Sequence, residues 1–368
     1  MDFTIALLPG DGIGPEVIEA AAQVMERVAS RFGHRLQMRR GRVGGNAIDE
    51  FGTPLPEETR ALCQQSDAIL FGAVGGPRWD DPKARVRPEG GILALRKEFG
   101  LFANLRPVKV YPAIMDSSPI KPHILKGVDM MIVRELTGGL YFSRPKKRWQ
   151  TSRGRRGVDT LRYTEEEIRR VLEVGFELAR GRRRHLTSVD KFNVLESSRL
   201  WREIAVEMSA DYPDVELDHM LADNAAMQII RSPGRFDVLV AENTFGDILS
   251  DEASVLSGSM GMLPSASLAG LPSAGAGRRR PPRRGSLYEP IHGSAPDIAG
   301  KGIANPIGAI LSVAMMLRYS LDLQREAEAV ERAVDGALAE GYRTPDIAGE
   351  RGQSVSTAKM SEVIAGSI

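Results

Sequence analysis

Two aspartates, Asp247 and Asp251, stand four positions apart in the stretch NTFGDILSDEAS, residues 243 to 254. Residues at this spacing lie on one face of a helix, one turn apart. Two like charges placed in this way destabilise an exposed helix by about 0.2–0.5 kcal/mol, so either water screens them or a cation lies between them. The plainer interpretation is a solvated helix start, where acidic side chains interact favourably with the helix dipole.

A third acid strengthens the metal interpretation. The stretch LADNAAMQ, residues 221 to 228, places Asp223 beside small and apolar residues. Oxygen ligands without a Cys–His spacing suit Mg²⁺ or Mn²⁺, hard ions that retain water and accept substrate oxygens. The histidines are too widely spaced in the sequence to suggest zinc, so a magnesium or manganese site is the chemistry that these acids favour.

Three arginines stand in or beside apolar segments. Arg96 and Arg106 lie in LRKEFGLFANLRP, and Arg134 ends the apolar run of IVREL. An arginine next to a buried strand needs a planar anion, and its forked donors suit a carboxylate. Each alone could equally form a surface ion pair. Together, and beside an acidic metal cluster, they indicate a small polycarboxylate held by both.

The elements that must position these groups alternate along the chain. Short apolar runs closed by glycine, proline or polar residues predict buried strands, at residues 3–8, 68–76, 130–136 and 236–243. Helical spacing of apolar residues predicts helices, at residues 15–32, 164–180, 196–209, 302–320 and 325–340. Strands that alternate with helices argue for an α/β fold with a largely parallel core.

Two stretches break this alternation. Residues 138–164 hold two β-like pieces around a long basic tip, which predicts a projecting hairpin arm. Residues 270–285 are of low complexity and contain five arginines, so the formal charge without them would be +1 − 5 = −4. The run RRRPPRR could bind RNA or another anion, but it has no aromatic residue on which a base could stack, so a nucleic-acid partner is not expected.

The glycine-rich turn PGDGIGPEV, residues 9 to 17, follows the first predicted strand. A dinucleotide-binding fingerprint needs G-x-G-x-x-G with an acidic residue about twenty positions on. Here Pro15 takes the place of the third glycine, and the region twenty residues on still has helical spacing. The motif therefore predicts a tight turn at a helix start and no Rossmann cradle.

Bulk composition sets further bounds. The chain has 368 residues and a formal net charge of +1, so the whole molecule offers no field that would gather nucleic acid or anionic membrane. A single cysteine excludes an internal disulfide and fits a reducing compartment. No segment reads as a signal peptide or is apolar for long enough to span a bilayer. We expect a soluble, cytoplasmic protein of two domains.

Several long motifs resemble the isocitrate/isopropylmalate dehydrogenase family, a group of metal-dependent decarboxylating dehydrogenases. They include RPEGGILALRKEFGLFANLRP, IVRELTGGLYF, SVDKFNVLE, FGDILSDEAS and YEPIHGSAPDIAGKGIANP. The resemblance implies a two-domain, non-Rossmann α/β fold and a homodimer whose subunits share their active sites. One domain would comprise residues 1–101 and 258–368 on the cofactor side, and the other residues 102–257, with the arm at about 138–164.

The resemblance also assigns roles to individual residues. Arg96, Arg106 and Arg134 would clamp the substrate carboxylates, and Asp223, Asp247 and Asp251 would bind Mg²⁺ or Mn²⁺, with Asp223 reaching across from the partner subunit. Tyr141 and Lys191 match the catalytic pair, with Lys191 also from the partner. The positions matched to cofactor binding are Gly76, Glu89, Asn193, His292, Gly293, Ser294, Ala295, Pro296, Asp297, Ile298 and Asn305.

Substrate and cofactor follow from two short segments. The segment with Glu89, Ile92 and Leu93 offers an apolar wall that suits an isopropyl group and lacks polar groups for a third carboxylate. With this wall, the family resemblance implies oxidative decarboxylation of (2R,3S)-3-isopropylmalate to 4-methyl-2-oxopentanoate in leucine biosynthesis, with homoisocitrate or a tartrate- or malate-type acid as the alternative substrate. Asp297 would accept both ribose hydroxyls and repel a 2′-phosphate, so NAD is expected. Phe192 departs from the family's usual alanine.

Overall fold

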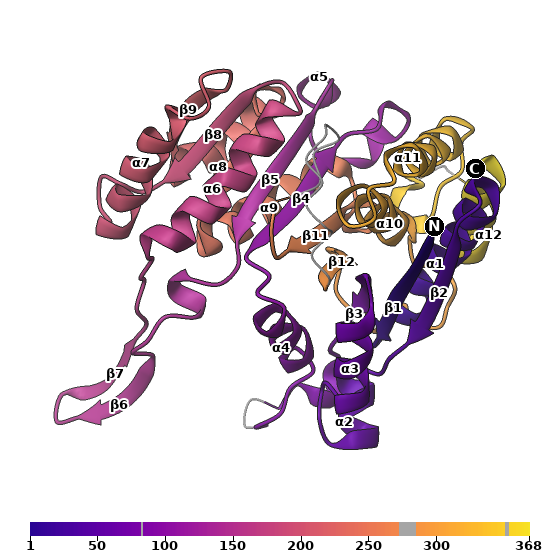
Figure 1. Ribbon diagram of the computed structural model, residues 1–368, viewed down its shortest axis with the longest axis horizontal. Coiled ribbons are helices and arrows are strands. Elements are labelled where there is room, and N and C mark those ends of the chain that lie inside the picture. The colour runs from indigo at the N-terminus through magenta and orange to yellow at the C-terminus, as the bar shows by residue number, and fades with distance from the viewer. Residues whose placement is uncertain (82–83, 272–284, 350–352) are drawn as a thin grey trace.

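The computed structural model describes residues 1–81, 84–271, 285–349 and 353–368. Within these residues the core is a ten-stranded sheet (Figure 1). Its strands follow one another in the order β2 (Arg35–Arg40), β1 (Asp2–Gly10), β3 (Ala68–Ala73), β12 (Ser286–Pro290), β11 (Pro264–Leu268), β4 (Ala103–Lys109), β5 (Asp129–Glu135), β10 (Val238–Ala241), β8 (His185–Asp190) and β9 (Glu216–Leu221).

Helices connect most of these strands. They are α1 (Gly14–Phe32), α2 (Gly45–Phe51), α3 (Glu57–Gln65), α4 (Gly90–Glu98), α5 (Pro122–Leu125), α6 (Glu165–Arg180), α7 (Glu196–Ser209), α8 (Ala222–Arg231), α9 (Asn243–Ser254), α10 (Ile307–Tyr319), α11 (Gln324–Ala339) and α12 (Thr357–Ser367). The α/β class is therefore confirmed, as are the predicted strands and helices in all but their exact ends.

The sheet is mostly parallel, with an antiparallel centre. Strands β1, β2, β3 and β12 pair in parallel, as do β5, β10, β8 and β9. At the centre β11 runs antiparallel to both β12 and β4, and β4 runs antiparallel to β5. The prediction of a largely parallel core is confirmed, and the antiparallel centre joins its two parallel halves.

One predicted boundary was wrong. The apolar run was expected to be helical from residue 302, but α10 begins at Ile307. The cause is local, because the side-chain Oδ1 of Asn305 accepts a hydrogen bond from the backbone N–H of Ile307 at 3.0 Å. Asn305 thereby satisfies a backbone donor at the helix start that has no partner within the helix, and residues 302–306 before the helix form bends and irregular backbone.

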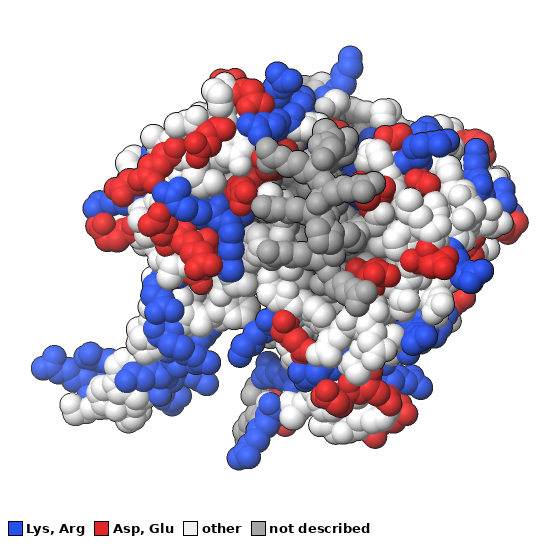
Figure 2. All heavy atoms as spheres, viewed as in Figure 1, with Lys and Arg blue, Asp and Glu red and all other residues white. Residues whose placement is uncertain are grey.

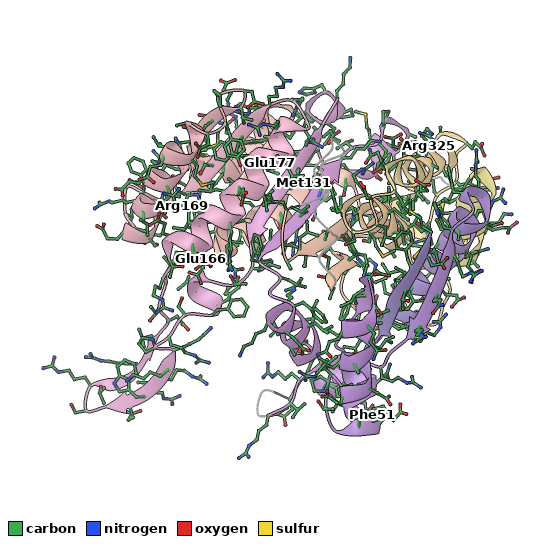
Figure 3. The ribbon with its side chains drawn as sticks, in the orientation of Figure 1. Phe51, Met131, Glu166, Arg169, Glu177 and Arg325 are labelled. Carbon is green, nitrogen blue, oxygen red and sulfur yellow. The ribbon has the colours of Figure 1, made fainter. Side chains whose placement is uncertain are left out.

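Helices cover the two faces of the sheet differently. On one face a continuous apolar cluster includes side chains of α1, α10 and α11 at one end of the sheet and of α6 and α7 at the other. On the opposite face the apolar packing is divided between a cluster with α3 and α4 and another with α8 and α9. Glu166 and Arg169 of α6, both labelled in Figure 3, keep solvent-accessible side chains.

The sheet order is relevant to the predicted domains. Strands from the two chain ends, up to β11, occupy one half of the sheet, and strands from the middle of the chain, from β4 onward, occupy the other. Hydrogen bonds between β11 and β4 and the shared apolar cluster nevertheless run across this boundary. The division into residues 1–101 with 258–368 and residues 102–257 stays a prediction.

The hairpin arm consists of β6 (Lys147–Thr151) and β7 (Gly154–Val158), an antiparallel pair separate from the main sheet. It projects from the body in Figure 1, and Figure 2 shows Lys and Arg side chains gathered on it. The arginine run at 278–284 lies outside the described residues, so the structure does not bear on its anion-binding role. Among the described residues, no helix is both long enough and apolar enough to cross a membrane.

Candidate active site

The gap between the two apolar clusters on one sheet face holds the candidate site. Neighbouring residues of a strand point to opposite faces, and the central strands β4, β5, β11 and β12 each place apolar residues in the continuous cluster on the other face. The polar residues next to these apolar ones consequently face the gap, and they are Arg106 on β4, Arg134 on β5, Ser265 on β11 and Glu289 on β12. Strand alternation thus brings residues from four strands to one place.

A pocket of about 180 Å³ lies in this gap. Its lining includes Ile92 and Arg96 from α4, Arg106 from β4, and the segments that end β3 and follow β12. Because β3 and β12 are parallel neighbours, their carboxyl ends meet at one edge of the sheet, where α/β proteins bind ligands. Residues predicted to bind substrate (Ile92, Arg96, Arg106) therefore line the same pocket as His292 and Gly293, which were predicted to bind the cofactor.

Two of the predicted clamp arginines are held by polar partners. Arg96 donates from Nη2 to Oε1 of Glu289 at 2.9 Å, and both side chains are largely buried. Arg106 donates from Nε to Oδ1 of Asn104 at 2.8 Å and from Nη1 to Oδ1 of Asp251 at 2.9 Å. These contacts fix the guanidinium planes while leaving both arginines on the pocket wall.

Arg134 is the most buried of the three arginines, with 8% of its side chain exposed. Its Nε and Nη2 donate to Oδ1 of Asn243 at 3.1 and 2.9 Å, and its Nη1 pairs with Oδ1 of Asp247. Burial, together with the neighbouring Arg106 and Arg96, lowers the pKa of Arg134 to about 10 against the opposing effect of Asp247. Guanidinium groups that repel one another in this way favour an anionic ligand between them.

Asp247 and Asp251 lie one turn apart on α9, as their spacing predicted. Asp247 accepts from Arg134 and Asp251 accepts from Arg106, so arginines partly neutralise both acids within the chain. No three acidic, histidine or cysteine side chains of the described residues come close enough together to hold a metal ion. The carboxylate oxygens of Asp247 and Asp251 have the chemistry that a hard divalent cation requires. Asp223, the third predicted ligand, does not lie with them in the single chain.

Lys191 and Asp223 form a separate pair. Lys191 follows β8, Asp223 lies in the first turn of α8, and Nζ of Lys191 donates to Oδ1 of Asp223 at 2.7 Å. This hydrogen bond holds the pKa of the Asp223 carboxyl below its ordinary value. Asn193, in the turn after Lys191, is exposed. The structure thus brings together Lys191 and Asp223, the two residues that were predicted to act in the partner's site. It places them away from Asp247 and Asp251 of the same chain.

Tyr141 ends a short 3₁₀ turn, η3 (Gly139–Tyr141), that follows β5. Its hydroxyl donates to Oδ2 of Asp247 at 3.2 Å, and its ring lies 5.9 Å from the guanidinium of Arg134. Partial burial and the Asp247 carboxylate raise the pKa of Tyr141, and they outweigh the opposing effect of Arg134.

The predicted cofactor loop packs against the glycine-rich turn at the start of the chain. The backbone N–H of Ile13 donates to the carbonyl of Ser294 at 2.8 Å, and a Cβ on Gly12 would lie 1.9 Å from that oxygen. Only glycine permits this approach, at a φ of +58°. The turn therefore borders the predicted cofactor loop.

The other predicted cofactor residues differ in exposure. Asp297, Pro296 and Gly293 are exposed. Burial lowers the pKa of His292 below its ordinary value. Asn305 is buried, with its amide donating to Asp346 at 3.0 Å. The remaining positions near the loop or the start of α4 are partly or fully exposed and lie outside the lining of the pocket, namely Gly76, Glu89, Ala295 and Ile298.

Comparison with known proteins decides the family. The profile of the isocitrate/isopropylmalate dehydrogenase family matches residues 4–364. The chain belongs to this family. Members that resemble it include the 3-isopropylmalate dehydrogenase of Geobacillus kaustophilus, 58% identical over 99% of this chain and 95% of that protein. The Bacillus subtilis enzyme of the same name is 57% identical over 99% of this chain and 96% of its own length.

Solved structures agree with this assignment. The isocitrate dehydrogenase of Methylococcus capsulatus superposes with a TM-score of 0.84 at 33% identity over 99% of both chains. A β-decarboxylating dehydrogenase from Thermococcus kodakarensis in its apo form gives a TM-score of 0.77 at 36% identity, over 99% of this chain and 96% of that one. The resemblance inferred from the motifs is therefore confirmed, and the chain is a dehydrogenase of the isocitrate/isopropylmalate type.

Sequence reasoning missed several side chains that shape the site of this dehydrogenase. Glu289 lines the pocket and binds Arg96, while Asn104 and Asn243 hold Arg106 and Arg134. A buried Asp11 accepts hydrogen bonds from the backbone N–H groups of Gly45 and Gly75 at 2.7 and 2.9 Å, which fixes the glycine-rich turn. The sequence offered one signal for Asp11 and Glu289, which is an acidic residue inside an apolar or glycine-rich run.

Proposed function

We propose that the protein catalyses the NAD⁺-dependent oxidative decarboxylation of (2R,3S)-3-isopropylmalate to 4-methyl-2-oxopentanoate and CO₂, a step of leucine biosynthesis in the cytoplasm. The observation that carries this proposal is a pocket in which Arg96 and Arg106 lie beside the apolar Ile92. Relatives above 50% identity bear the name 3-isopropylmalate dehydrogenase. Burying an isopropyl group against Ile92 contributes about 2 kcal/mol, at roughly 0.8 kcal/mol per carbon.

The chain's own residues supply binding and proton transfer. Arg96, Arg106 and Arg134 hold the two carboxylates of the substrate and orient its C2–H bond. Lys191, directly or through water, takes the proton of the C2 hydroxyl. Asp223, Asp247 and Asp251 would hold Mg²⁺ or Mn²⁺, which would supply Lewis-acid polarisation of the C2 oxygen, and NAD⁺ would supply the hydride acceptor. After CO₂ leaves from C3, Tyr141 donates its proton to that carbon.

The two groups of catalytic side chains favour a homodimer with shared sites. Tyr141, Arg134 and Asp247 contact one another, whereas Lys191 contacts Asp223. We infer that Lys191 and Asp223 of each subunit complete the site of the other subunit. Asp223 would then be the third metal ligand of that site. NAD is preferred to NADP because the exposed carboxylate of Asp297 would repel a 2′-phosphate.

A direct assay tests the proposal. NADH formation is followed with 3-isopropylmalate, isocitrate, homoisocitrate and tartrate side by side, with and without a chelator. We expect the highest kcat/KM for 3-isopropylmalate, loss of turnover with the chelator, and poor use of NADP⁺. A higher kcat/KM for any of the other three acids contradicts the substrate assignment, and turnover that survives full chelation contradicts the metal assignment.

A further inference from the structure

Asn243, the first residue of α9, joins two parts of the site through one side chain. It is fully buried, with 0% exposure. Its Oδ1 accepts from Nε and Nη2 of Arg134 at 3.1 and 2.9 Å, and its Nδ2 donates to the carbonyl of Gly138 at 3.1 Å. A single amide thus contacts both a clamp arginine and the backbone that leads into the Tyr141 turn.

The backbone of Asn243 is itself anchored. Its N–H donates to the hydroxyl of Tyr163 at 3.0 Å, and that hydroxyl donates to Oε2 of Glu242 at 3.0 Å. The other carboxylate oxygen of Glu242 accepts from the N–H of Phe245 at 2.8 Å and caps α9. These buried hydrogen bonds leave the Asn243 amide a single orientation.

The turn that carries Tyr141 packs tightly on the same anchor. A Cβ on Gly138 would lie 2.5 Å from the ring of Tyr163, and one on Gly139 would lie 2.5 Å from its hydroxyl. Gly139 also has a φ of +73°, a conformation that favours glycine. The turn therefore packs against Tyr163 and is hydrogen-bonded by Asn243. These two contacts position Tyr141 against Asp247.

We propose that Asn243 is a positioning residue that couples the substrate clamp at Arg134 to the proton donor at Tyr141. This inference rests on the proposed function, which gives both residues their roles. Through one amide, the arginine that binds a carboxylate and the turn that carries the phenol keep a fixed geometry. Loss of that amide should reduce turnover as well as substrate binding, because a misplacement of about 1 Å costs roughly 100-fold in rate.

Asn104 provides a matched comparison. It is also buried, at 1% exposure, and its Oδ1 accepts from Nε of Arg106 at 2.8 Å. Its Nδ2 donates to the carbonyl of Ala266 at 3.2 Å, on β11, and so reaches no catalytic turn. Removal of the Asn104 amide should therefore loosen an arginine and leave the proton donor in place.

The test compares Asn243→Ala, Asn243→Asp and Asn104→Ala in steady-state kinetics of the full-length protein. We expect Asn243→Ala to lower kcat about 100-fold and raise KM about tenfold, and Asn104→Ala to raise KM about tenfold with kcat within about twofold of wild type. Asn243→Asp has the same shape and still accepts from Arg134, but it cannot donate to Gly138, so its kcat should fall likewise. If Asn243→Ala does not fold, the kcat of Asn243→Asp tests the positioning role of Asn243.

Two results would overturn the inference. One is a kcat within about threefold of wild type in Asn243→Asp, and the other is an equal loss of kcat in Asn104→Ala. Wild-type turnover decides the proposed function separately. If one of the other three hydroxy acids is the better substrate, the proposed function fails, and the same comparison of variants is made with that acid. A wild type that oxidises none of the four acids overturns both.

Discussion

A dimer that combines two chains with different inactivating substitutions should regain dehydrogenase activity. In the single chain Lys191 contacts Asp223 at 2.7 Å, while Tyr141 contacts Asp247 at 3.2 Å. If each site takes the first pair from one subunit and the second from the other, defects in different pairs can complement. We would co-express Lys191→Met and Asp247→Asn chains that carry different affinity tags, and purify heterodimers on both tags in sequence.

The size of the recovery follows from counting sites. A heterodimer has two sites, of which one combines the intact halves of both chains and the other combines both defects. Its kcat per dimer should therefore be about half that of wild type, because a twofold dimer presents two equivalent sites. Each variant alone should lose on the order of 10²–10⁴-fold, the range for removal of a general base or an electrostatic stabiliser.

A second pair of variants is the control. Tyr141→Phe and Asp247→Asn fall in the same half of the site, because these two side chains contact each other. Their heterodimer contains no intact site and should form NADH at the rate of the separate variants. Two results would refute the division of the site between subunits. One is a recovery of NADH formation in the control heterodimer, and the other is no recovery in the purified heterodimer of Lys191→Met and Asp247→Asn.

Three further predictions concern stability and cofactor choice. Burial lowers the pKa of His292 below its ordinary value near 6.5, so the unfolded chain takes up a proton at a higher pH than the folded chain does. The folded state therefore loses stability as the pH falls below that value. The urea midpoint of unfolding should drop between about pH 7 and 5, and it should drop less in His292→Gln. Asp237 is 1% exposed and binds Nε of Arg182 at 2.8 Å, so Asp237→Ala should cost about 3–5 kcal/mol in urea unfolding, and a loss under 1 kcal/mol would contradict its role as a buried ion-pair partner. Asp297→Arg should raise the kcat/KM ratio of NADP⁺ to NAD⁺ by at least about tenfold, and an unchanged ratio would remove Asp297 from cofactor selection.

The sequence was sufficient for elements with a strong apolar pattern and insufficient for the centre of the sheet. Continuous apolar runs predicted β1, β3, β5 and β10, and helical spacing predicted the long helices. The strands β2, β8 and β9 were not predicted, and neither were β4, β11 and β12 at the centre of the sheet. Each of the three central strands contains a proline, β11 and β12 also contain buried serines, and β11 pairs with β4 from much earlier in the chain, so no continuous apolar run marks them in the sequence.

The site shows a similar limit. The clamp arginines could be found because a charge beside an apolar run is conspicuous. Asn104 and Asn243 could not, because a neutral amide has no characteristic spacing and its partner is set by the packed structure. Asn104 lies opposite Arg134 in the register of β4 and β5, yet alternation and the position of α9 direct its amide to Arg106. Such pairings exist only after the sheet has formed.

The charges of the clamp explain why the proposed site would bind a diacid and a divalent cation together. In the single chain Arg106 contacts Asp251, and Arg134 contacts Asp247. A dianionic substrate alone would meet these carboxylates as well as the guanidinium groups, and a cation alone would meet the guanidinium groups as well as the carboxylates. A cation on Asp247 and Asp251 would release both arginines for the substrate, and the substrate would neutralise the arginines that repel the cation. Each ligand would therefore remove the electrostatic cost of binding the other, which is positive coupling between the two.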